Sequence, residues 1–205
     1  MLITEPITDD GRTLRRERNR ETIVAALLSL YDSGQIDVSA AEIASQAGLS
    51  QRSLFRYFDD VNDLYRTACA TQFERISSFA KISNPGCGSV IEKIEHFVDQ
   101  RIRLFRQVGN IGRVARAHSH RVPAIDKQLG RGRRLLRNQM LNHFEAELAS
   151  LERQDRLAAT AGIDVLCSFE SYELMRHDHG LSDSSIKATL TISLTKYLST
   201  KKRTT

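Results

Sequence analysis

Residues 39–58, SAAEIASQAGLSQRSLFRYF, predict two short helices separated by a tight turn. Ser39 and Glu42 have the spacing of a capping box, in which each side chain bonds the backbone amide of the other residue. Gly48 follows the last residue of the first helical pattern, where a left-handed backbone can end a helix at little steric cost. Ser50 is placed to cap a second helix that begins one residue later.

The second of these helices separates apolar from polar side chains. Leu54 and Phe58 fall on one face and are expected to be buried. The polar face carries Gln51, Arg52, Ser53 and Arg56. In a helix-turn-helix, the start of the second helix reaches base edges in the major groove, while nearby hydroxyls and cations contact phosphates. Because Gln and Arg can form bidentate bonds to adenine and guanine edges, the pattern predicts DNA binding.

Residues 38–64 resemble the DNA-binding signature of the TetR/AcrR family of transcriptional regulators. The shared features are a capped helix that ends in A-G-L-S, a second helix of the form S-L-F-x-Y-F, and Leu64 near the start of a long helix. The resemblance implies an all-α fold with an N-terminal three-helix helix-turn-helix head in residues 1–60. A long helix would join this head to a helical effector-binding and dimerisation domain in residues 61–205.

The resemblance also implies a function, namely a homodimeric repressor that binds a palindromic DNA operator and is released by a small-molecule effector. The expected DNA-binding residues are Arg16, Ser39, Ser50, Gln51, Arg52, Ser53, Phe55, Arg56 and Tyr57. The chain departs from the family pattern at Phe55, where Tyr is usual, and at Val61, where Lys is usual. These departures remove a hydroxyl and a cation that commonly contact phosphate, and Arg52 and Arg56 could replace the missing charge.

The positive charge of this 205-residue chain is unevenly distributed. Residues 1–60 hold seven Arg against ten Asp or Glu, but five of the seven lie between residues 12 and 20. Residues 99–137 hold eleven Lys or Arg against two acids. This second basic stretch is compatible with a nucleic-acid patch, a pocket for an anionic effector, or a solvated helix face.

The predicted helix that starts at Ser89 places an arginine among apolar residues, because Arg101 shares a side with Phe97 and Phe105. Such an arginine is paired, extends its charged end to solvent, or binds an anion. The predicted effector site contains Phe97, Arg101, Phe105, Arg116 and Glu170. Its expected ligand is an amphipathic or anionic small molecule, such as a fatty acyl derivative.

Apolar spacing predicts the remaining helices, and residues 1–11 are expected to be a frayed arm. The expected helices cover residues 13–32, about 60–80, 89–108, 124–152, 156–177 and 183–197, with a short helix before Pro123. Phe79, Leu135 and Leu174 are among the expected packing positions. The resemblance implies that the last two helices pack against a second copy of the chain.

The sequence gives no support to catalysis or to metal binding. It contains no Gly-rich phosphate loop, no G-x-S-x-G elbow and no H-E-x-x-H motif, so no catalytic residue, cofactor or metal is expected and the protein is not expected to be an enzyme. The three Cys are scattered, and the pairs at His118 and His120 and at His177 and His179 point to different sides of a helix.

No apolar run reaches the roughly 20 residues that span a bilayer, and the N-terminus lacks a signal-peptide pattern. A cytoplasmic protein without a membrane partner is therefore expected. The alternative interpretation is a helical metabolite-binding protein or small enzyme with a vestigial DNA-binding head.

Overall fold

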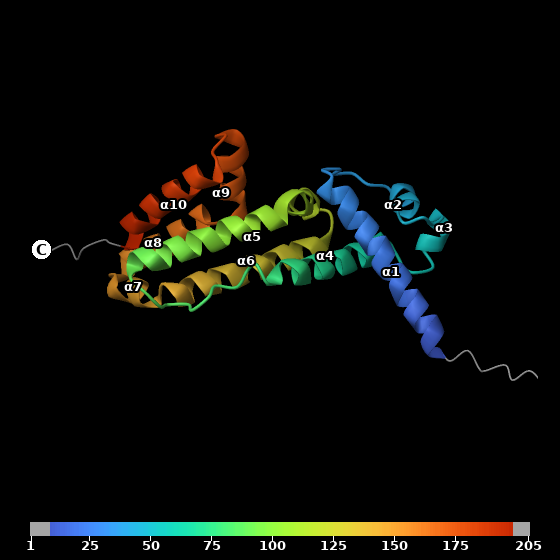
Figure 1. Cartoon of the computed structure of the whole chain (residues 1–205), viewed down its shortest axis with the longest axis horizontal. Coiled ribbons are helices and arrows are strands. Elements are labelled where there is room, and N and C mark those ends of the chain that lie inside the picture. Colours follow the sequence, from blue (N-terminus) through green and yellow to red (C-terminus); the bar gives the residue numbers. More distant parts are fainter. Residues whose placement is uncertain (1–8, 199–205) are drawn as a thin grey trace, which may run out of the picture. The chain divides into compact units, whose positions relative to one another are not determined.

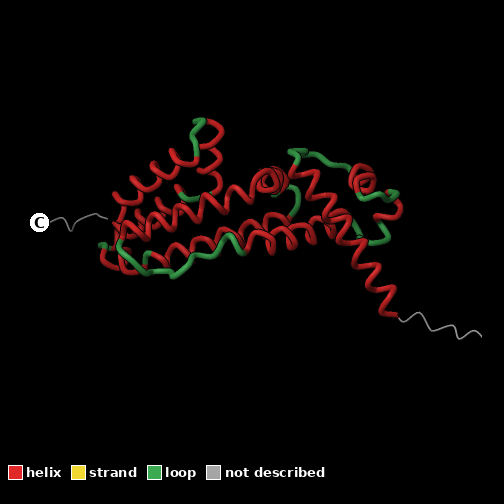
Figure 2. Tube along the Cα trace, in the orientation of Figure 1, coloured by secondary structure: helices red, strands yellow, loops and turns green. Residues whose placement is uncertain are grey.

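The computed structural model describes residues 9–198, and all regular elements in this part of the chain are helices (Figures 1 and 2). The predicted all-α class is thus confirmed. Within the described residues the chain forms two compact units, one from residues 9–75 and 109–129 and the other from residues 76–108 and 130–198. These two units are defined by contacts within the structure. The predicted boundary at residue 60 instead separates an expected DNA-binding part from an expected effector-binding and dimerisation part.

The first compact unit contains α1 (Asp9–Asp32), α2 (Ala40–Gln46), α3 (Gln51–Leu54) and most of α4 (Val61–Ser77). Asp60 caps α4 by accepting the Asp63 amide proton on its carboxylate, at an N···O distance of 2.7 Å. The buried core consists of Ile23, Val24, Leu27, Leu28, Tyr31, Ile43, Ala44, Leu54, Phe58, Leu64, Ala68 and Val114.

Helix α1 begins earlier than the sequence predicted. The predicted arm covered residues 1–11, but residues 9–11 already belong to α1, and residues 1–8 lie outside the described part of the chain. Asp9 and Asp10 occupy the first turn of the helix.

The second compact unit contains the first part of α5 (Val90–His118) and the later part of α6 (Pro123–His143). It also contains all of α7 (Glu145–Ser150), α8 (Arg153–Leu166), α9 (Phe169–Glu173), the π-helical turn η1 (Leu174–Asp178) and α10 (Asp183–Leu198). Ser89 and Glu92 form a capping box before α5. The predicted interruption of this helix lies at Gly109, whose φ of 44° and ψ of −141° are not helical. The division between the compact units falls at the same place.

Two predicted helices are broken in the structure. The helix expected over residues 124–152 ends at His143, and α7 follows after Phe144, which has a φ of −110° and a ψ of 23°. The helix expected over residues 156–177 divides into α8, α9 and η1. The division occurs because Ser168 caps a new helix: its hydroxyl accepts the Ser171 amide proton at 3.1 Å.

Three predicted packing positions are wrong, since Phe79, Leu135 and Leu174 are 41%, 40% and 54% exposed. In each case the following residue packs against the core instead: Ala80, Leu136 and Met175. Helix α4 has already ended before Phe79, and at Leu174 the wider π-helical turn rotates the side chains relative to an α-helix. None of the described helices is both long and apolar enough to cross a bilayer.

Candidate DNA-binding surface

Helix α2 starts with the predicted capping box. The Ser39 hydroxyl oxygen accepts the Glu42 amide proton at 3.2 Å, and Glu42 Oε2 accepts the Ser39 amide proton at 2.8 Å. The bonds from the Ser39 hydroxyl and amide hold the pKa of the exposed Glu42 carboxyl below its ordinary value. Ile43 and Ala44 are buried on the other side of the helix, so α2 is fixed both at its start and along one face.

The turn between α2 and α3 also has the predicted conformation. Gly48 has a φ of 69°, and the Leu49 amide donates to the Ala44 carbonyl at 2.8 Å. Ser50 then caps α3, with its hydroxyl oxygen accepting the Ser53 amide proton at 3.1 Å. The left-handed backbone at Gly48 and the helix cap at Ser50 explain why a glycine and a serine occupy these two positions between the helices.

Helix α3 spans only Gln51–Leu54, and a helix of one turn is not stable alone in water. The first compact unit holds it in place through Leu54 and Phe58, which are 0% and 1% exposed. The opposite side is open to solvent at Gln51, Arg52, Phe55 and Arg56, while Ser53 and Tyr57 are half-buried. An amide and two guanidinium groups are therefore presented together on a short, immobilised element.

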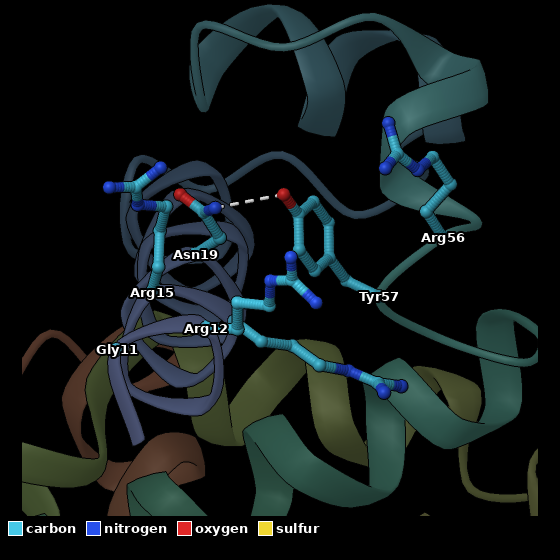
Figure 3. Close-up of a pocket in the computed structure, with 7 residues that line it drawn as sticks. Gly11, Arg12, Arg15, Asn19, Arg56 and Tyr57 are labelled. Atoms are coloured by element: carbon cyan, nitrogen blue, oxygen red, sulfur yellow. Dashed lines mark hydrogen bonds between the residues drawn. The ribbon is translucent and has the colours of Figure 1, made fainter. Parts of the chain in front are cut away.

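A pocket of about 470 Å³ lies beside this surface. It is lined by Gly11, Arg12, Arg15, Arg16, Asn19, Arg56 and Tyr57. Figure 3 shows Arg12, Arg15 and Asn19 on α1, with Arg56 and Tyr57 contributed by the segment after α3. The Asn19 amide donates to the Tyr57 hydroxyl oxygen at 2.8 Å. This contact joins two elements that the sequence separates by 38 residues.

The sequence predicted three of these residues as DNA contacts, namely Arg16, Arg56 and Tyr57. It did not select Asn19, and it noted Arg12 and Arg15 only as members of a basic cluster. Their spacing was an available signal, because positions 12, 15, 16 and 19 fall on one face of a helix. The contribution of Arg56 and Tyr57 to the same pocket depends on the tertiary fold.

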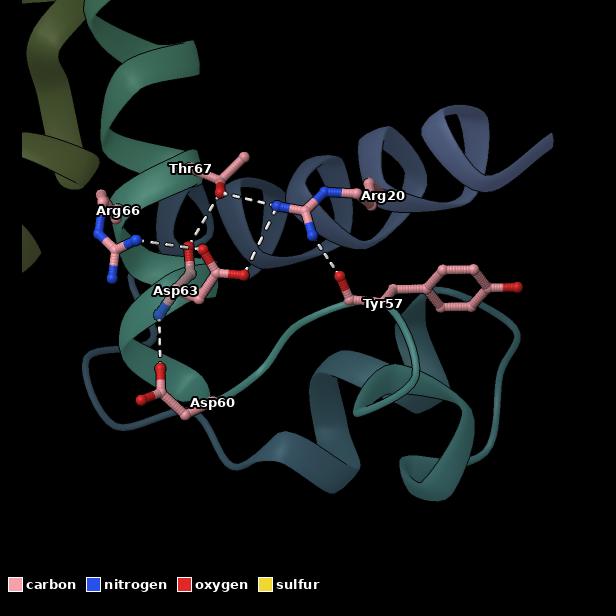
Figure 4. Close-up of polar contacts among 6 residues, drawn as sticks. All are labelled: Arg20, Tyr57, Asp60, Asp63, Arg66 and Thr67. Atoms are coloured by element: carbon pink, nitrogen blue, oxygen red, sulfur yellow. Dashed lines mark hydrogen bonds and ion pairs between the residues drawn. The ribbon is translucent and has the colours of Figure 1, made fainter. Parts of the chain in front are cut away.

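Arg20 has a different role from the arginines that line the pocket. One guanidinium nitrogen donates to the Tyr57 backbone carbonyl, and the other lies 3.6 Å from Asp63 Oδ2 and 3.4 Å from Thr67 Oγ1 (Figure 4). The guanidinium carbon also lies 4.2 Å from the centroid of the Phe58 ring. Arg20 therefore connects α1 and α4 to the segment that carries Tyr57.

Solved structures share this arrangement of helices. A TetR-family transcriptional regulator from Streptomyces coelicolor aligns over 88% of this chain and 80% of its own, with 19% identity and a TM-score of 0.68. The chain has a TetR-like fold. The comparison confirms the predicted resemblance for the fold. At this sequence identity, a likeness between structures establishes the fold alone.

Two further structures agree with the TetR-like fold. A protein from Mesorhizobium loti, described as a candidate TetR-family transcriptional regulator, aligns over 90% of this chain and 96% of its own at 17% identity, with a TM-score of 0.63. A candidate transcriptional regulator from Streptomyces coelicolor A3(2) aligns over 89% of this chain and 99% of its own at 19% identity, with a TM-score of 0.57. No family model matches this chain, and no curated protein does either.

In the second compact unit of the TetR-like fold, Arg101 is buried and satisfied by neutral groups. Its guanidinium donates to Gln100 Oε1 at 2.6 Å, to Gln139 Oε1 at 3.3 Å and to the Leu136 carbonyl at 2.8 Å. The guanidinium carbon lies 4.4 Å from the centroid of the Phe97 ring. Burial lowers the pKa of Arg101 to about 10, so the residue keeps its charge at neutral pH.

The five residues predicted to bind an effector are not all brought together. Phe97, Arg101 and Phe105 are buried along α5, and Phe105 packs edge-on against Phe169. Glu170 is partly exposed and forms an ion pair with Arg133 at 2.8 Å. Arg116 belongs to the first compact unit, where it donates to the Gly112 carbonyl at 3.1 Å.

Among residues 9–198, no three His, Cys, Asp or Glu side chains are grouped to hold a metal ion.

Proposed function

We propose that this protein is a sequence-specific DNA-binding transcriptional regulator that reads base edges with α3. The observation that carries this proposal is the exposure of Gln51 and Arg52 at the start of a helix held from behind by Leu54 and Phe58. The first residues of the second helix are those that enter the major groove in a helix-turn-helix. Gln51 would read adenine and Arg52 guanine, each through two hydrogen bonds.

Contacts to the DNA backbone would come from residues around α3. Ser39, Ser50, Ser53 and Tyr57 offer hydroxyl groups, and Arg16 and Arg56 offer cations. Phe55 is 43% exposed and offers an apolar edge that suits a thymine methyl group. Such backbone contacts set the position of the protein on the duplex, whereas the base contacts of α3 set its sequence preference.

The proposed regulator acts as a homodimer through α8 and α10. Leu157 and Val165 on α8 are 65% and 63% exposed, and Ile192 on α10 is 59% exposed. Ala161, which lies between Leu157 and Val165 on α8, is exposed and apolar as well. So is Ala188, one turn before Ile192 on α10. A second copy that covers this surface would remove apolar area from water. A two-fold symmetric dimer presents two α3 helices, which suits a palindromic operator.

Regulation by a small molecule is the remaining part of the proposal. Residues 61–205 would bind an amphipathic or anionic effector near Phe97, Arg101 and Phe105, and residues 1–60 would bind DNA. Arg101 supports this assignment because it is a buried cation whose three hydrogen-bond acceptors are neutral. An effector that prefers the protein conformation with low operator affinity would release a repressor from its operator.

Selection of binding sites from random duplex DNA at two salt concentrations tests the central proposal. We expect enrichment of a palindrome by the native protein. Arg52→Ala should relax the preference at one position of each half-site, with a loss of about 1–3 kcal/mol in discrimination. The matched control is Arg18→Ala, which removes an exposed arginine of α1 that does not line the pocket. Binding without enrichment that fades as salt rises would contradict sequence-specific recognition and favour a metabolite-binding protein or small enzyme.

Light scattering of purified protein tests the proposed dimer. We expect a dimer for the native chain and a monomer for Val165→Asp or Ile192→Asp, because each places a charge in the apolar surface. Leu135→Asp is the control, since Leu135 is an exposed leucine that belongs to α6 and not to α8 or α10. A monomeric native chain would contradict the proposed interface.

Thermal unfolding with fatty acyl compounds tests the proposed effector site. Such a compound should raise the midpoint of the native protein and should have less effect on Arg101→Gln. The control is Arg133→Gln, which removes an exposed arginine of α6. An unchanged midpoint for the native protein across saturated and unsaturated acyl chains would remove the proposed effector class.

A further inference from the structure

The pocket beside α3, called the arginine pocket below, collects positive charge without compensating acids. Its lining residues include four arginines and no Asp or Glu. Across residues 11–198, the structure gives Arg12, Arg15, Arg16 and Arg56 no ion pair with a carboxylate. Arg20, one turn further along α1, differs because Asp63 lies 3.6 Å away. The arginine pocket is therefore a place where an anion would meet several uncompensated cations.

The walls of the arginine pocket come from two separate elements. Arg12, Arg15 and Arg16 occur at spacings of three and four residues on α1. Arg56 comes from the segment after α3 (Figure 3). Tyr57 lies between them and accepts a hydrogen bond from Asn19 through its hydroxyl oxygen. Because that oxygen is the acceptor in this bond, the Tyr57 hydroxyl proton remains available to a bound group.

The backbone at Tyr57 is fixed, which gives the arginine pocket a defined wall. Arg20 donates to the Tyr57 carbonyl, and the neighbouring Phe58 is 1% exposed in the core. The arginine side chains on α1 are exposed, so an anion can reach them without a rearrangement of the helix. A rigid wall and accessible cations together make a preformed site.

The chemistry of the lining residues selects the class of ligand. Guanidinium groups bind phosphate through paired hydrogen bonds and remain charged at all physiological pH values. Four such groups around one cavity repel each other, and an anion relieves this repulsion. A volume of about 470 Å³ lies within the range of small-molecule sites. The pocket therefore has room for a phosphate ester with its attached sugar.

We propose that the arginine pocket is a single site for one phosphate ester group, shared by Arg12, Arg15, Arg16 and Arg56. The phosphate can come from the DNA backbone or from a free nucleotide, and these two sources share the same chemistry. The first source rests on the proposed DNA-binding function, and the second source does not. A free nucleotide would compete with DNA, because Arg56 and Tyr57 directly follow the exposed face of α3.

The salt dependence of binding to a fixed duplex distinguishes one shared phosphate from several separate contacts. Each phosphate neutralised contributes about 0.9 to the slope of log affinity against log salt concentration. For one shared site, the triple variant Arg12→Gln, Arg15→Gln, Arg16→Gln should lower the slope by about 0.9. Three separate contacts would lower the slope by about 2.7, which would overturn the single site, whereas an unchanged slope would exclude the DNA backbone as the source of the phosphate. Arg18→Gln is the control and should leave the slope unchanged.

Addition of ADP identifies the source of the phosphate group. If the group is a free nucleotide, ADP should raise the thermal midpoint of the native protein and displace labelled duplex, and the triple variant should lose both effects. If ADP has no effect while the slope falls as expected, the phosphate belongs to DNA. The proposal would be overturned if these arginines contribute nothing to the slope and the native protein does not respond to ADP.

The failure of this inference is distinguishable from the failure of the proposed function. If the native protein still enriches a palindrome while the triple variant changes neither the slope nor the ADP response, only the arginine pocket is refuted. If no palindrome is enriched but ADP stabilises the native protein and not the triple variant, only sequence-specific regulation is refuted. Circular dichroism of the triple variant establishes that its helices are intact.

Discussion

Gly162 in α8 lies directly against the ring of Tyr197 in α10: a Cβ atom at position 162 would stand 2.5 Å from Tyr197 Cζ and 2.6 Å from its hydroxyl oxygen. Ordinary Cβ atoms do not approach other heavy atoms so closely. The Tyr197 ring can keep this position only against a residue that has no side chain. Glycine in a helix interior is normally unfavourable, so its presence here follows from the close packing of α8 on α10.

Gly162→Ala should destabilise the second compact unit. Overpacking costs about 1–3 kcal/mol, which exceeds the gain of about 1 kcal/mol in helix propensity. Urea unfolding followed by circular dichroism would measure the change. Gly132→Ala in α6 is the control and should stabilise the protein slightly, because a Cβ atom there meets nothing within 4 Å. When Gly162→Ala is combined with Tyr197→Ala, the overpacking penalty should disappear; a persistent penalty would show that Tyr197 is not its cause.

His143 should make the protein less stable in mild acid. Its Nδ1 accepts the Gly86 amide proton at 3.2 Å and its Nε2 donates to the Lys93 carbonyl at 3.0 Å, so the buried ring is neutral. Burial lowers the pKa of His143 below its ordinary value of 6.5. The nearby charges of Lys93 and His96 also lower the pKa, whereas the bond to the Lys93 carbonyl and the charge of Glu147 oppose the shift.

The sign of the pH effect follows from the lowered pKa. Above the ordinary value of 6.5 both the folded and unfolded states hold a neutral His143, and the folded state has its full stability. As the pH falls below 6.5 toward the lowered pKa, the unfolded state binds the proton more readily, and the free energy of unfolding decreases. Urea unfolding at about pH 7.5 and about pH 5.5 would measure this decrease. His143→Gln should reduce the difference and His179→Gln, at an exposed position, should retain it; equal pH dependence in both variants would contradict this origin.

Arg20→Lys should weaken the first compact unit even though the charge is retained. A lysine cannot reach the Tyr57 carbonyl, Asp63 and Thr67 at the same time, because it lacks the planar fork of arginine. The expected loss is about 1–2 kcal/mol in the free energy of unfolding. DNA affinity should fall equally for all sequences, since the base-reading residues are unchanged. Arg18→Lys, at an exposed position of α1, provides the control, and equal stability of the two variants would refute the role of Arg20.

Ser50→Ala should remove the cap of α3 and lower the free energy of unfolding by about 1 kcal/mol. Ser50→Gly should have a smaller effect, because glycine is itself tolerated at this position of a helix. The amide of Ser53 loses its acceptor in both variants. Ser45→Ala, at an exposed position within α2, should change the stability little. Unfolding curves that coincide for Ser50→Ala and Ser45→Ala would contradict the capping role.

The caps and the turn of the helix-turn-helix could be predicted from the sequence, because their signals are local. The second helix was predicted to reach Phe58, but α3 ends at Leu54. Ser39, Gly48 and Ser50 act through bonds and dihedral angles within a few residues of themselves. Leu54 and Phe58 follow a simple spacing rule and are buried as predicted. In this part of the chain, local preference and tertiary packing agree.

The second compact unit was predicted less accurately because its packing is not set by local signals. The break at Ser168 depends on a serine cap inside a segment that otherwise has helical periodicity. The exposure of Leu135 and Leu174 reflects which of two adjacent apolar residues meets the core. Apolar spacing alone cannot choose between neighbours, since either choice leaves an apolar stripe along the helix.

The arginine pocket was only partly predictable for a related reason. The face that carries Arg12, Arg15 and Arg16 follows from helical spacing, but its pairing with Arg56 joins segments that lie far apart in the sequence. The role of Arg20 could not be separated from that of its neighbours by sequence, since all five arginines between residues 12 and 20 look alike there. Their different surroundings in the fold give them different roles.

The single-turn length of α3 has an evolutionary consequence. Gln51 and Arg52 are exposed, while the position of the helix depends on Ser50, Leu54 and Phe58. Substitutions at exposed positions usually change stability by no more than about 0.5 kcal/mol. The residues proposed to read DNA can therefore be exchanged while the folded head persists. Descendants of this protein could acquire new target sequences through one or two mutations, without a preceding stabilising change.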